Sequence, residues 1–346
     1  MKDRIGLAVI GTGMAAKPHA LALKDLTDQI DVRGVYSRSE TARQRFCKTY
    51  GFKEANDLDA LASDPSVDAL LLITPPNARV ELVTLFAKHG KHILLEKPLE
   101  RTSDAAQDIV NICAKAGVSL GVVFQHRFRA ASEALAKLLV QGDLGTIQIV
   151  RAEIPWWRNQ SYYDEPGRGT YSRDGGGVLI SQAIHTLDLM LSLTGPVTSV
   201  QAICATTSFH KMEAEDFSAG ALKFESGAVG SFFASTASFP GNAESLTFDC
   251  EKGSVLLKSG VLTIHWRDGC VETIGEEAGT GGSVDPMAFP YDWHKSLIAD
   301  FADAINTGRP PRVTGSQALS VHQLVAAIEA SSRTGQNVDI TKRQNS

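Results

Sequence analysis

The sequence predicts an α/β protein of two domains, in which a doubly wound parallel sheet is followed by a domain with a mostly antiparallel sheet. Three observations lead to this fold class. Apolar runs alternate with amphipathic helical segments in the first third of the chain. These runs are apolar throughout, as in strands that helices cover on both faces. From about residue 197, short strands separated by turn residues replace this pattern.

The first domain, residues 1–123, reads as strands and helices in strict alternation. Strands are expected at Ile5–Ile10, Val32–Tyr36, Ala69–Ile73, His92–Leu95 and Val118–Val123, and helices at Ala15–Leu26, Glu40–Tyr50, Arg79–His89 and Ser103–Ala116. The strands are continuous apolar runs, and the helices repeat apolar residues every three or four positions. This order predicts parallel strands joined by helical crossovers.

The second domain, residues 124–346, begins with a helix at Ser132–Leu139, a strand at Thr146–Glu153 and an irregular aromatic stretch. A helix at Val178–Leu193 then ends before Gly195. The remaining elements are strands at Val197–Ala205, Asp216–Phe224, Val229–Ser235, Glu244–Asp249, Ser254–Lys258 and Val261–Trp266, a mobile loop at Gly275–Pro286, and helices at Asp292–Asn306 and Ser316–Ser332. Successive short strands favour antiparallel pairing.

Charge and composition exclude several classes of protein. Lysine and arginine number 34 and aspartate and glutamate 39, so the net charge is −5 and favours neither nucleic acid nor an anionic membrane. The apolar runs are strand-sized and no signal peptide is evident, so we expect a cytoplasmic protein without membrane contact. The five cysteines are odd in number and lack a CxxC pair, which indicates reduced thiols and no metal site.

The strongest local motif follows the first strand and matches the G-x-G-x-x-A fingerprint of dinucleotide-binding loops. Its residues are Gly11, Thr12, Gly13, Met14, Ala15 and Ala16. Gly11 permits the tight turn, Gly13 lets the backbone approach a pyrophosphate, and Ala16 allows close packing of helix on strand. A plain glycine turn is the alternative, but the position between strand and helix favours dinucleotide binding.

The end of the second strand bears on the choice of cofactor. Asp31 has the spacing of the acid that binds the ribose of NAD, but it precedes the strand, whereas ligands bind beyond the carboxyl ends. Ser37 and Arg38 stand at that end instead. A hydroxyl and a guanidinium suit a 2′-phosphate, so NADP is favoured over NAD. Alternatively, Arg38 is a solvated charge or stacks on the adenine of either cofactor.

Two further strands end in residues suited to chemistry. The third leads into Thr74, Pro75, Pro76 and Asn77, at the edge where a nicotinamide would lie. The fourth ends in Glu96, Lys97 and Pro98. An ammonium there can hydrogen-bond a substrate oxygen that alternates between alcohol and carbonyl. A surface ion pair is the alternative for Lys97, and a rigid loop is the alternative for the prolines.

These motifs together resemble the glucose–fructose oxidoreductase and inositol dehydrogenase family (Gfo/Idh/MocA). The resemblance rests on Gly11–Ala16, Thr74–Asn77, Glu96–Pro98, Gly175–Gly177 with Gln182 and His185, and the terminal pattern of His294, Phe301 and Gly308–Pro311. It implies an N-terminal Rossmann domain and a C-terminal α/β domain whose large open sheet forms a homodimer or homotetramer. It also implies hydride exchange between a nicotinamide cofactor and a sugar, cyclitol or related polyol.

The resemblance assigns Lys97 as the catalytic lysine and His185 as the general acid or base. In a continuous helix from Val178, Ser181, His185 and Asp188 would share one face. Histidine exchanges protons near neutral pH, which suits this role. Many sugar dehydrogenases of the family carry an aspartate where this chain has Ser181. The identity of the substrate therefore does not carry over from them.

The irregular stretch after the first strand of the second domain resembles the substrate loop of sugar-acting relatives. Candidate substrate contacts are Gln125, Arg127, Trp157, Arg158, Tyr163, Arg168, Ser181 and Gln182, with Lys97 and His185. Aromatic rings can pack on the apolar faces of a sugar, and Arg158 can bind a carboxylate. Packing at the domain junction is the alternative for these residues.

The predicted function is thus an NAD(P)-dependent oxidoreductase acting on a sugar, cyclitol or sugar-derived polyol. Two alternatives stay open. Some relatives are glycosidases that hold NAD and oxidise the sugar only transiently, and a non-catalytic dinucleotide sensor would bind partners through its sheet. The presence of both Lys97 and His185 favours an enzyme.

Overall fold

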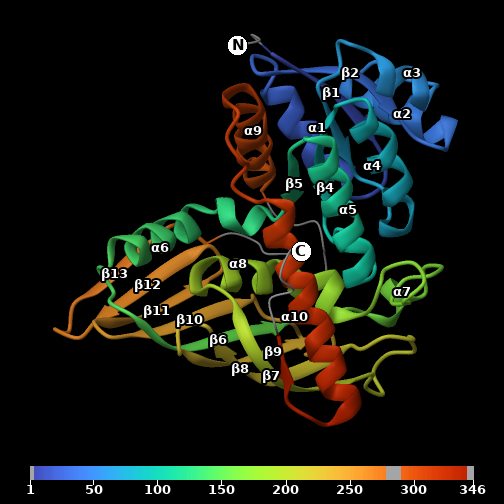
Figure 1. Cartoon of the computed structure of the whole chain (residues 1–346). Helices are drawn as coiled ribbons and strands as arrows, with labels where there is room; N and C mark the ends of the chain where they lie inside the picture. Colours follow the sequence, from blue (N-terminus) through green and yellow to red (C-terminus); the bar gives the residue numbers. More distant parts are fainter. Residues whose placement is uncertain (1–3, 278–289, 341–346) are drawn as a thin grey trace. The chain divides into compact units, whose positions relative to one another are not determined.

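The computed structural model of the chain describes residues 4–277 and 290–340 and divides them into two compact units (Figure 1). The first unit contains residues 4–125 and 290–319, and the second contains residues 126–277 and 320–340. The mobile loop predicted at Gly275–Pro286 lies outside the described residues from position 278 onward. Among the described residues, no helix combines the length and apolar character needed to cross a membrane.

The first unit is built on a five-stranded sheet in the order β2-β1-β3-β4-β5, and all four pairings are parallel. Its strands are β1 (Ile5–Ile10), β2 (Ile30–Tyr36), β3 (Ala69–Leu72), β4 (His92–Glu96) and β5 (Leu120–Val123), and its helices are α1 (Ala16–Asp25), α2 (Glu40–Tyr50), α3 (Leu58–Ser63), α4 (Arg79–Lys88), α5 (Ser103–Ala116) and α9 (Asp292–Thr307). The predicted doubly wound parallel sheet is confirmed. Every residue of β1, β3 and β5 is buried, as their unbroken apolar sequence requires.

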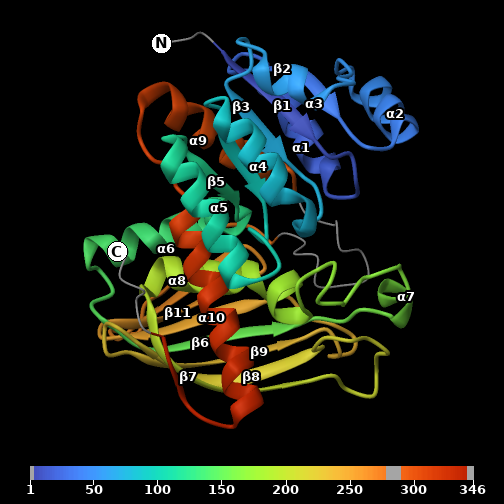
Figure 2. The ribbon, with the colours of Figure 1, turned by 45° about the vertical axis from the view of Figure 1, so that its right-hand side comes forward.

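Helices α1 and α9 pack against each other (Figure 1), and α4 packs against α5 (Figure 2). The sequence predicts two domains that are each one continuous stretch of chain. In the structure, α9 belongs to the first unit although it follows the strands of the second unit in the sequence. Residues 290–319 return to the first unit, where the Val122 amide donates to the Val313 carbonyl at 3.2 Å. Gly121 of β5 has no side chain, and this leaves room for the ring of Phe301 on α9. The helix-breaking residues Gly308–Pro311 do not predict that the chain returns to the first unit, because this return depends on packing against β5.

The second unit contains a nine-stranded sheet in the order β13-β12-β11-β10-β6-β9-β8-β7-β14. Its strands are β6 (Ile147–Pro155), β7 (Val197–Ala205), β8 (Phe217–Phe224), β9 (Val229–Ser235), β10 (Ser245–Cys250), β11 (Gly253–Lys258), β12 (Val261–Trp266), β13 (Val271–Ile274) and β14 (Val338–Asp339), and the remaining helices of the chain are α6 (Ala130–Gln141), α7 (Gln160–Tyr163), α8 (Ile184–Thr194) and α10 (Gly315–Thr334). Among the strands that the structure describes in this unit, only β6 and β9 pair in parallel, so the predicted mostly antiparallel sheet is confirmed.

One face of this sheet carries helices, and no helix of the described residues covers the other, which we call the open face (Figures 1 and 2). Helix α8 contacts β6 and β10, and α6 contacts β12. Along β6, Val150, Ala152 and Ile154 are buried, whereas Arg151 and Glu153 between them are exposed. This alternation is typical of a strand with one covered face.

The prediction of one uninterrupted α-helix at Val178–Leu193 is wrong over its first turn. Leu179–Ala183 forms a π-helical turn, and α8 begins only at Ile184. A π turn spaces its hydrogen bonds one residue wider than an α-helix. Ser181 and His185 are therefore not related by the α-helical spacing that the sequence suggested, whereas His185 and Asp188 both lie in α8.

Candidate active site

The loop between β1 and α1 has the geometry that a dinucleotide requires. Gly11 has a φ of +111°, and a Cβ there would lie 2.8 Å from the carbonyl of Ile73. A Cβ on Gly13 would instead point into open space. Ala16 is fully buried where α1 leaves the loop. Each position of the fingerprint thus has its own physical reason. Gly11 adopts a strained turn, Gly13 leaves open space, and Ala16 allows close packing.

The start of α1 fits a pyrophosphate in charge as well as in shape. None of the described side chains caps the helix at Ala15, and its first turn contains no acidic residue. Thr12 is half-buried, and Met14 is 55% exposed. Main-chain N–H groups at such a helix end, together with the helix dipole, bind anions. The loop therefore fits the phosphates of a dinucleotide.

The two ends of β2 differ as the sequence suggested. Asp31 is aligned with Gly6 at the amino end and forms an ion pair with Arg33 at 3.1 Å. Arg38 is exposed just beyond the carboxyl end, after half-buried Ser37. Asp31 therefore lies at the opposite end of the strand from the β1–α1 loop, whereas Arg38 lies at the same end.

The carboxyl ends of β3 and β4 are joined by the buried side chain of Arg79, the first residue of α4. Its Nε and Nη2 donate to the Thr74 carbonyl at 3.0 and 2.8 Å, and its Nη1 donates to the Glu96 carbonyl. The Thr74 hydroxyl is buried and has no hydrogen-bond partner among the described residues. Pro75 and Asn77 are exposed, and Pro76 begins a short 3-10 turn. The ends of both strands are therefore held in one arrangement.

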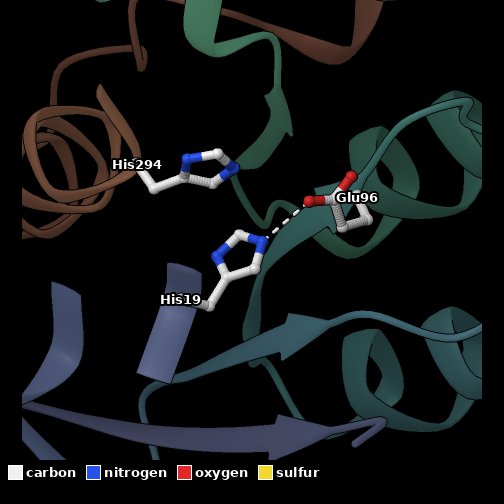
Figure 3. Close-up of side chains that lie close together, drawn as sticks. All are labelled: His19, Glu96 and His294. Atoms are coloured by element: carbon white, nitrogen blue, oxygen red, sulfur yellow. Dashed lines mark hydrogen bonds and ion pairs between the residues drawn. The ribbon is translucent and has the colours of Figure 1, made fainter. Parts of the chain in front are cut away.

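Glu96, at the end of β4, lies in a buried cluster with His19 of α1 and His294 of α9 (Figure 3). His19 Nε2 is 2.7 Å from Glu96 Oε1, and the His19 and His294 rings meet edge to face at 4.9 Å. Burial opposes ionisation of Glu96, but the hydrogen bond from His19 and nearby positive charge hold its pKa below the ordinary value. Burial lowers the pKa of His294 to about 3, so this ring is neutral.

The same three side chains have the composition of a metal site, since one ligand atom from each lies within 4.8 Å of the others. Two ligands of one tetrahedral zinc ion stand roughly 3.3 Å apart, given metal–ligand distances of about 2.0–2.1 Å. The 2.7 Å between His19 and Glu96 is the distance of a hydrogen bond. We therefore interpret the cluster as a hydrogen-bonded network.

In the second unit, the triple glycine leads into the turn that carries Gln182 and His185. A Cβ on Gly177 would lie 1.8 Å from the carbonyl oxygen of Glu215, so only glycine fits there. The Glu215 carboxylate accepts the amides of Gly177 at 3.1 Å and Leu179 at 3.0 Å. Burial raises the pKa of Glu215, and these amides oppose that shift. The start of the helical segment is thus fixed by a buried carboxylate.

His185 stacks on the ring of His126, with centroids 4.9 Å apart and an interplanar angle of 25°. His126 Nε2 lies 2.6 Å from Arg129 Nη2, and Arg129 donates to Glu244 at 2.8 Å. All four side chains are buried. This succession of contacts fixes the plane of the His185 ring, which suits a group that exchanges a proton in a set direction.

Arg127, a predicted substrate contact, forms a forked ion pair with Asp188 one turn after His185. The two bonds measure 2.7 and 2.6 Å, and Asp188 is fully buried. Burial raises the pKa of Asp188, and Arg127 opposes this. The guanidinium thus anchors α8 near His185.

Of the predicted substrate loop, one part gathers around Tyr162. The Arg168 guanidinium lies 4.1 Å from the centre of the Tyr162 ring, and that of Arg158 lies 5.6 Å from it. Gln182 donates to the Tyr162 hydroxyl at 3.3 Å. Arg158 is buried and also faces the Trp156 ring at 5.2 Å. Two cations and an amide therefore surround one phenol.

The other predicted contacts have further partners, although the Tyr163 ring also meets the Tyr162 ring edge to face at 5.0 Å. The buried Tyr163 hydroxyl is 2.6 Å from Thr236 Oγ1, and Trp157 packs edge to face on Phe209 and Phe239. Gln125 is buried and belongs to the first unit, as does Lys97, whereas His185 belongs to the second. The convergence of Lys97 and His185 on one nicotinamide stays a prediction.

Comparison with known proteins decides the family. Residues 5–124 match the model of an oxidoreductase family with an NAD-binding Rossmann fold, and residues 132–256 match the GFO/IDH/MocA C-terminal domain. The chain belongs to the Gfo/Idh/MocA family of oxidoreductases. The resemblance noted in the sequence is thereby confirmed, as is its classification as an oxidoreductase.

Several Gfo/Idh/MocA proteins match nearly the whole chain. The D-xylose 1-dehydrogenase (NADP+) 2 of Haloferax volcanii is 26% identical over 90% of this chain and 92% of its own length. The myo-inositol 2-dehydrogenase of Thermotoga maritima is 27% identical over 90% and 91%. An uncharacterized oxidoreductase of Synechocystis is 29% identical, but that match spans only 53% of the relative.

Among solved structures, the WlbA dehydrogenase of Bordetella pertussis in complex with NADH and UDP-GlcNAcA is 28% identical. It covers 98% of this chain and 99% of its own, with a TM-score of 0.83. Levoglucosan dehydrogenase has a TM-score of 0.86 at 21% identity, which shows a shared fold. The Gfo/Idh/MocA architecture thus extends over the described chain.

Several groups of this Gfo/Idh/MocA site were not predicted from the sequence. Arg79 and Glu215 bind main-chain groups distant in sequence, and His19 and His126 contact site residues distant in sequence. Tyr162 lies in the predicted aromatic stretch but was not assigned a role. A local signal existed only for Arg79, an arginine at the start of a helix directly after a loop at the carboxyl edge of the sheet.

Proposed function

We propose that this enzyme transfers a hydride between a nicotinamide cofactor, with NADP preferred, and a carbinol or carbonyl of a sugar, cyclitol or sugar-derived polyol. The observation that carries the proposal is the placement of Glu96 and Lys97 at the carboxyl end of β4, in a sheet whose β1–α1 loop fits a pyrophosphate. The printed functions of two relatives, xylose and inositol dehydrogenases, support the substrate class.

The proposed roles follow from the chemistry of the side chains. When bound, the nicotinamide supplies or accepts the hydride. Lys97 hydrogen-bonds the substrate oxygen and stabilises the charge that develops there. His185, held in plane by the His126 ring, exchanges the hydroxyl proton. Thr74, Pro75, Pro76 and Asn77 border the nicotinamide, and Gly11–Ala15 hold the phosphates.

The preference for NADP rests on Arg38. This guanidinium is exposed at the carboxyl end of β2, while the acidic residue with the spacing typical of NAD sites, Asp31, lies at the amino end. Arginine binds phosphate through forked, charge-assisted hydrogen bonds. Ser37 adds a hydroxyl beside it.

The substrate side of the proposal rests on the group around Tyr162. Arg158, Arg168 and Gln182 present donors there, and donors of this kind bind hydroxyl or carboxylate oxygens. Ser181 leaves the site without the carboxylate that many relatives have. We therefore expect substrate hydroxyls to be bound mainly by donors of this group.

The test is the growth of nicotinamide absorbance with a panel of sugars, cyclitols and sugar acids, for the native enzyme and for Lys97→Met and His185→Gln. Both variants are expected to lose turnover by about 100-fold or more while they retain dinucleotide affinity. Lys88→Met, at an exposed lysine of α4, is the matched control and keeps full activity.

Three results would each contradict a part of the proposal. Release of a free sugar without net change in nicotinamide absorbance would indicate a glycosidase. Dinucleotide binding without turnover of any sugar, cyclitol or sugar acid in the panel would indicate a sensor. Turnover that survives both replacements would remove the roles given to Lys97 and His185.

A further inference from the structure

We propose that Arg79 and Glu96 are positioning residues that clamp the peptide between Glu96 and Lys97 and so fix the origin of the catalytic lysine side chain. This inference rests on the proposed role of Lys97. It concerns two residues that touch the main chain of the site, and it explains why two charged side chains are buried beneath it.

Arg79 holds the carbonyl side of this peptide. The residue is 2% exposed, and its Nη1 donates to the Glu96 carbonyl, while Nη2 lies 3.4 Å from the Lys97 carbonyl. The opposite edge of the same guanidinium donates twice to Thr74. Because the guanidinium is planar and rigid, it fixes the end of β4 relative to the end of β3.

Glu96 holds the amide side of the peptide. Its Oε2 accepts the Lys97 N–H at 3.1 Å, and its Oε1 is fixed by His19 Nε2 at 2.7 Å. His19 of α1 therefore fixes the Glu96 carboxylate, and this carboxylate in turn orients the Lys97 amide. Both polar groups of one peptide are bound by buried side chains of opposite charge.

The energetic cost of this arrangement argues against a role in stability alone. Burial lowers the pKa of Arg79 to about 10, which shows that the folded environment disfavours its charge. Strand-end carbonyls can reach water or a neutral donor at a lower cost of desolvation. A fixed position of the Lys97 side chain increases the rate of reaction rather than stability, because a misplacement of about 1 Å can reduce turnover about 100-fold.

The charged groups around Glu96 make the clamp visible in a pH profile. His19 of α1, His294 of α9 and Lys97 face the carboxylate, and Arg79 of α4 lies beside both Glu96 and Glu100. The positive charge of Lys97 favours ionised Glu96, so the carboxylate equally favours the ammonium of Lys97. Its loss in Glu96→Gln should move the limb of the pH profile of kcat/KM that reports Lys97 toward lower pH.

Steady-state kinetics of Arg79→Gln, Arg79→Lys and Glu96→Gln test the proposal, with dinucleotide affinity and melting temperature measured in parallel. Lys91→Gln is the matched control. Lys91 is also a buried cation that donates to main-chain carbonyls, those of Asp64 at 2.8 Å and Val67 at 2.7 Å, but at the amino edge of the same sheet.

We expect Arg79→Gln to lose kcat by about 100-fold with dinucleotide affinity retained, and Arg79→Lys to recover part of the loss. Lys91→Gln should lose stability but not kcat. Unchanged kcat in Arg79→Gln, or an equal loss in the Lys91 control, would overturn the clamp. If Arg79→Gln does not fold, Glu96→Gln decides, because full activity with an unshifted pH profile overturns the proposal.

Failure of this inference is distinguishable from failure of the proposed function. An inactive Lys97→Met beside a fully active Arg79→Gln would remove only the clamp. An active Lys97→Met would remove the catalytic role of Lys97 on which the clamp rests.

Discussion

Arg38 is the residue on which the choice of cofactor depends. We predict that Arg38→Ala raises the dissociation constant for NADP by about 10- to 100-fold and changes that for NAD little, because charge-assisted hydrogen bonds contribute roughly 1.5–3 kcal/mol. Fluorescence titration with both nucleotides measures this. Arg33→Ala, an exposed arginine paired with Asp31 at the other end of β2, is the control and should affect neither. Equal losses for both nucleotides would contradict the assignment.

Gly13 provides a second test at the residue scale. Because a Cβ at this position meets no protein atom within 4 Å, we predict that Gly13→Ala leaves the melting temperature unchanged. The same methyl group would occupy the space of a pyrophosphate, so the dissociation constant for the dinucleotide should rise at least tenfold, or about 1.4 kcal/mol. Isothermal titration calorimetry and thermal unfolding separate the two effects. Undiminished binding would place the pyrophosphate elsewhere.

The residues that could be identified from sequence are those whose reason is local. Gly11, Gly13 and Ala16 lie close together in one loop, and their spacing alone predicts that the loop binds a dinucleotide. Arg79 and His19 act on Glu96, 17 and 77 positions away. No short pattern encodes such contacts, and they follow only once β1, β3 and β4 are known to be neighbours.

At the scale of elements, two carboxylic acids interact. Glu215 binds the end of the triple glycine, and Glu329 belongs to α10. Burial, followed by the charge of Glu215, raises the pKa of Glu329 on α10 to about 7. The folded state therefore holds this proton more tightly than the unfolded chain, whose glutamates titrate near 4.3. The contribution of Glu329 to the free energy of unfolding should consequently fall as pH rises from about 4.5 to 7, by up to about 3 kcal/mol. The buried, neutral His294 contributes in the opposite direction below about pH 6.5, so the contribution of Glu329 is measured as the difference between the native protein and Glu329→Gln.

Urea unfolding across this pH range checks the prediction. The free energy of unfolding of Glu329→Gln minus that of the native protein should increase as pH rises from about 4.5 to 7, and the variant should be the more stable of the two at pH 8, since the half-buried charge is gone. Asp108→Asn, at an exposed position of α5, is the control, and its difference from the native protein should stay constant. A Glu329→Gln difference that decreases over the same interval would contradict the sign.

Elements could be predicted where both ends carry their own signals. The bounds of α2 are those expected from sequence, because the Ser39 hydroxyl caps its first turn and Gly51 adopts the left-handed conformation at its end. The helical segment before α8 lacks such a cap, and the Glu215 carboxylate provides it from 36 and 38 positions away. Its π turn therefore could not be read from local sequence.

At the scale of the whole molecule, the open face of the nine-stranded sheet is where we propose that subunits meet, in a homodimer or homotetramer. Ile149 of β6 is 43% exposed and is aligned with Val229 of β9, which is 49% exposed. We predict that Ile149→Asp with Val229→Asp reduces the mass measured by light scattering to that of one chain. Val140→Asp, at an 89% exposed position of α6, should not change it. A monomeric native protein would contradict the proposal.

Sheet type and the approximate positions of most strands could be predicted, because apolar runs and turn residues are properties of the sequence itself. The short strands β13 and β14 were not predicted. The strand order could not be predicted either. The parallel pairing of β6 with β9, and the addition of β14 beside β7, join strands that are distant in sequence. Such pairings depend on long-range packing and leave no periodic trace.

The return of residues 290–319 to the first unit has a consequence for how this protein is made. Ribosomes release a chain from its amino end at about 5–20 residues per second, and units generally fold as they emerge. Here β1 to β5 emerge first, but α9 and the segment paired with β5 follow only after the strands of the second unit have been synthesised. One flank of the sheet in the nascent first unit must therefore stay uncovered while the strands of the second unit are being synthesised.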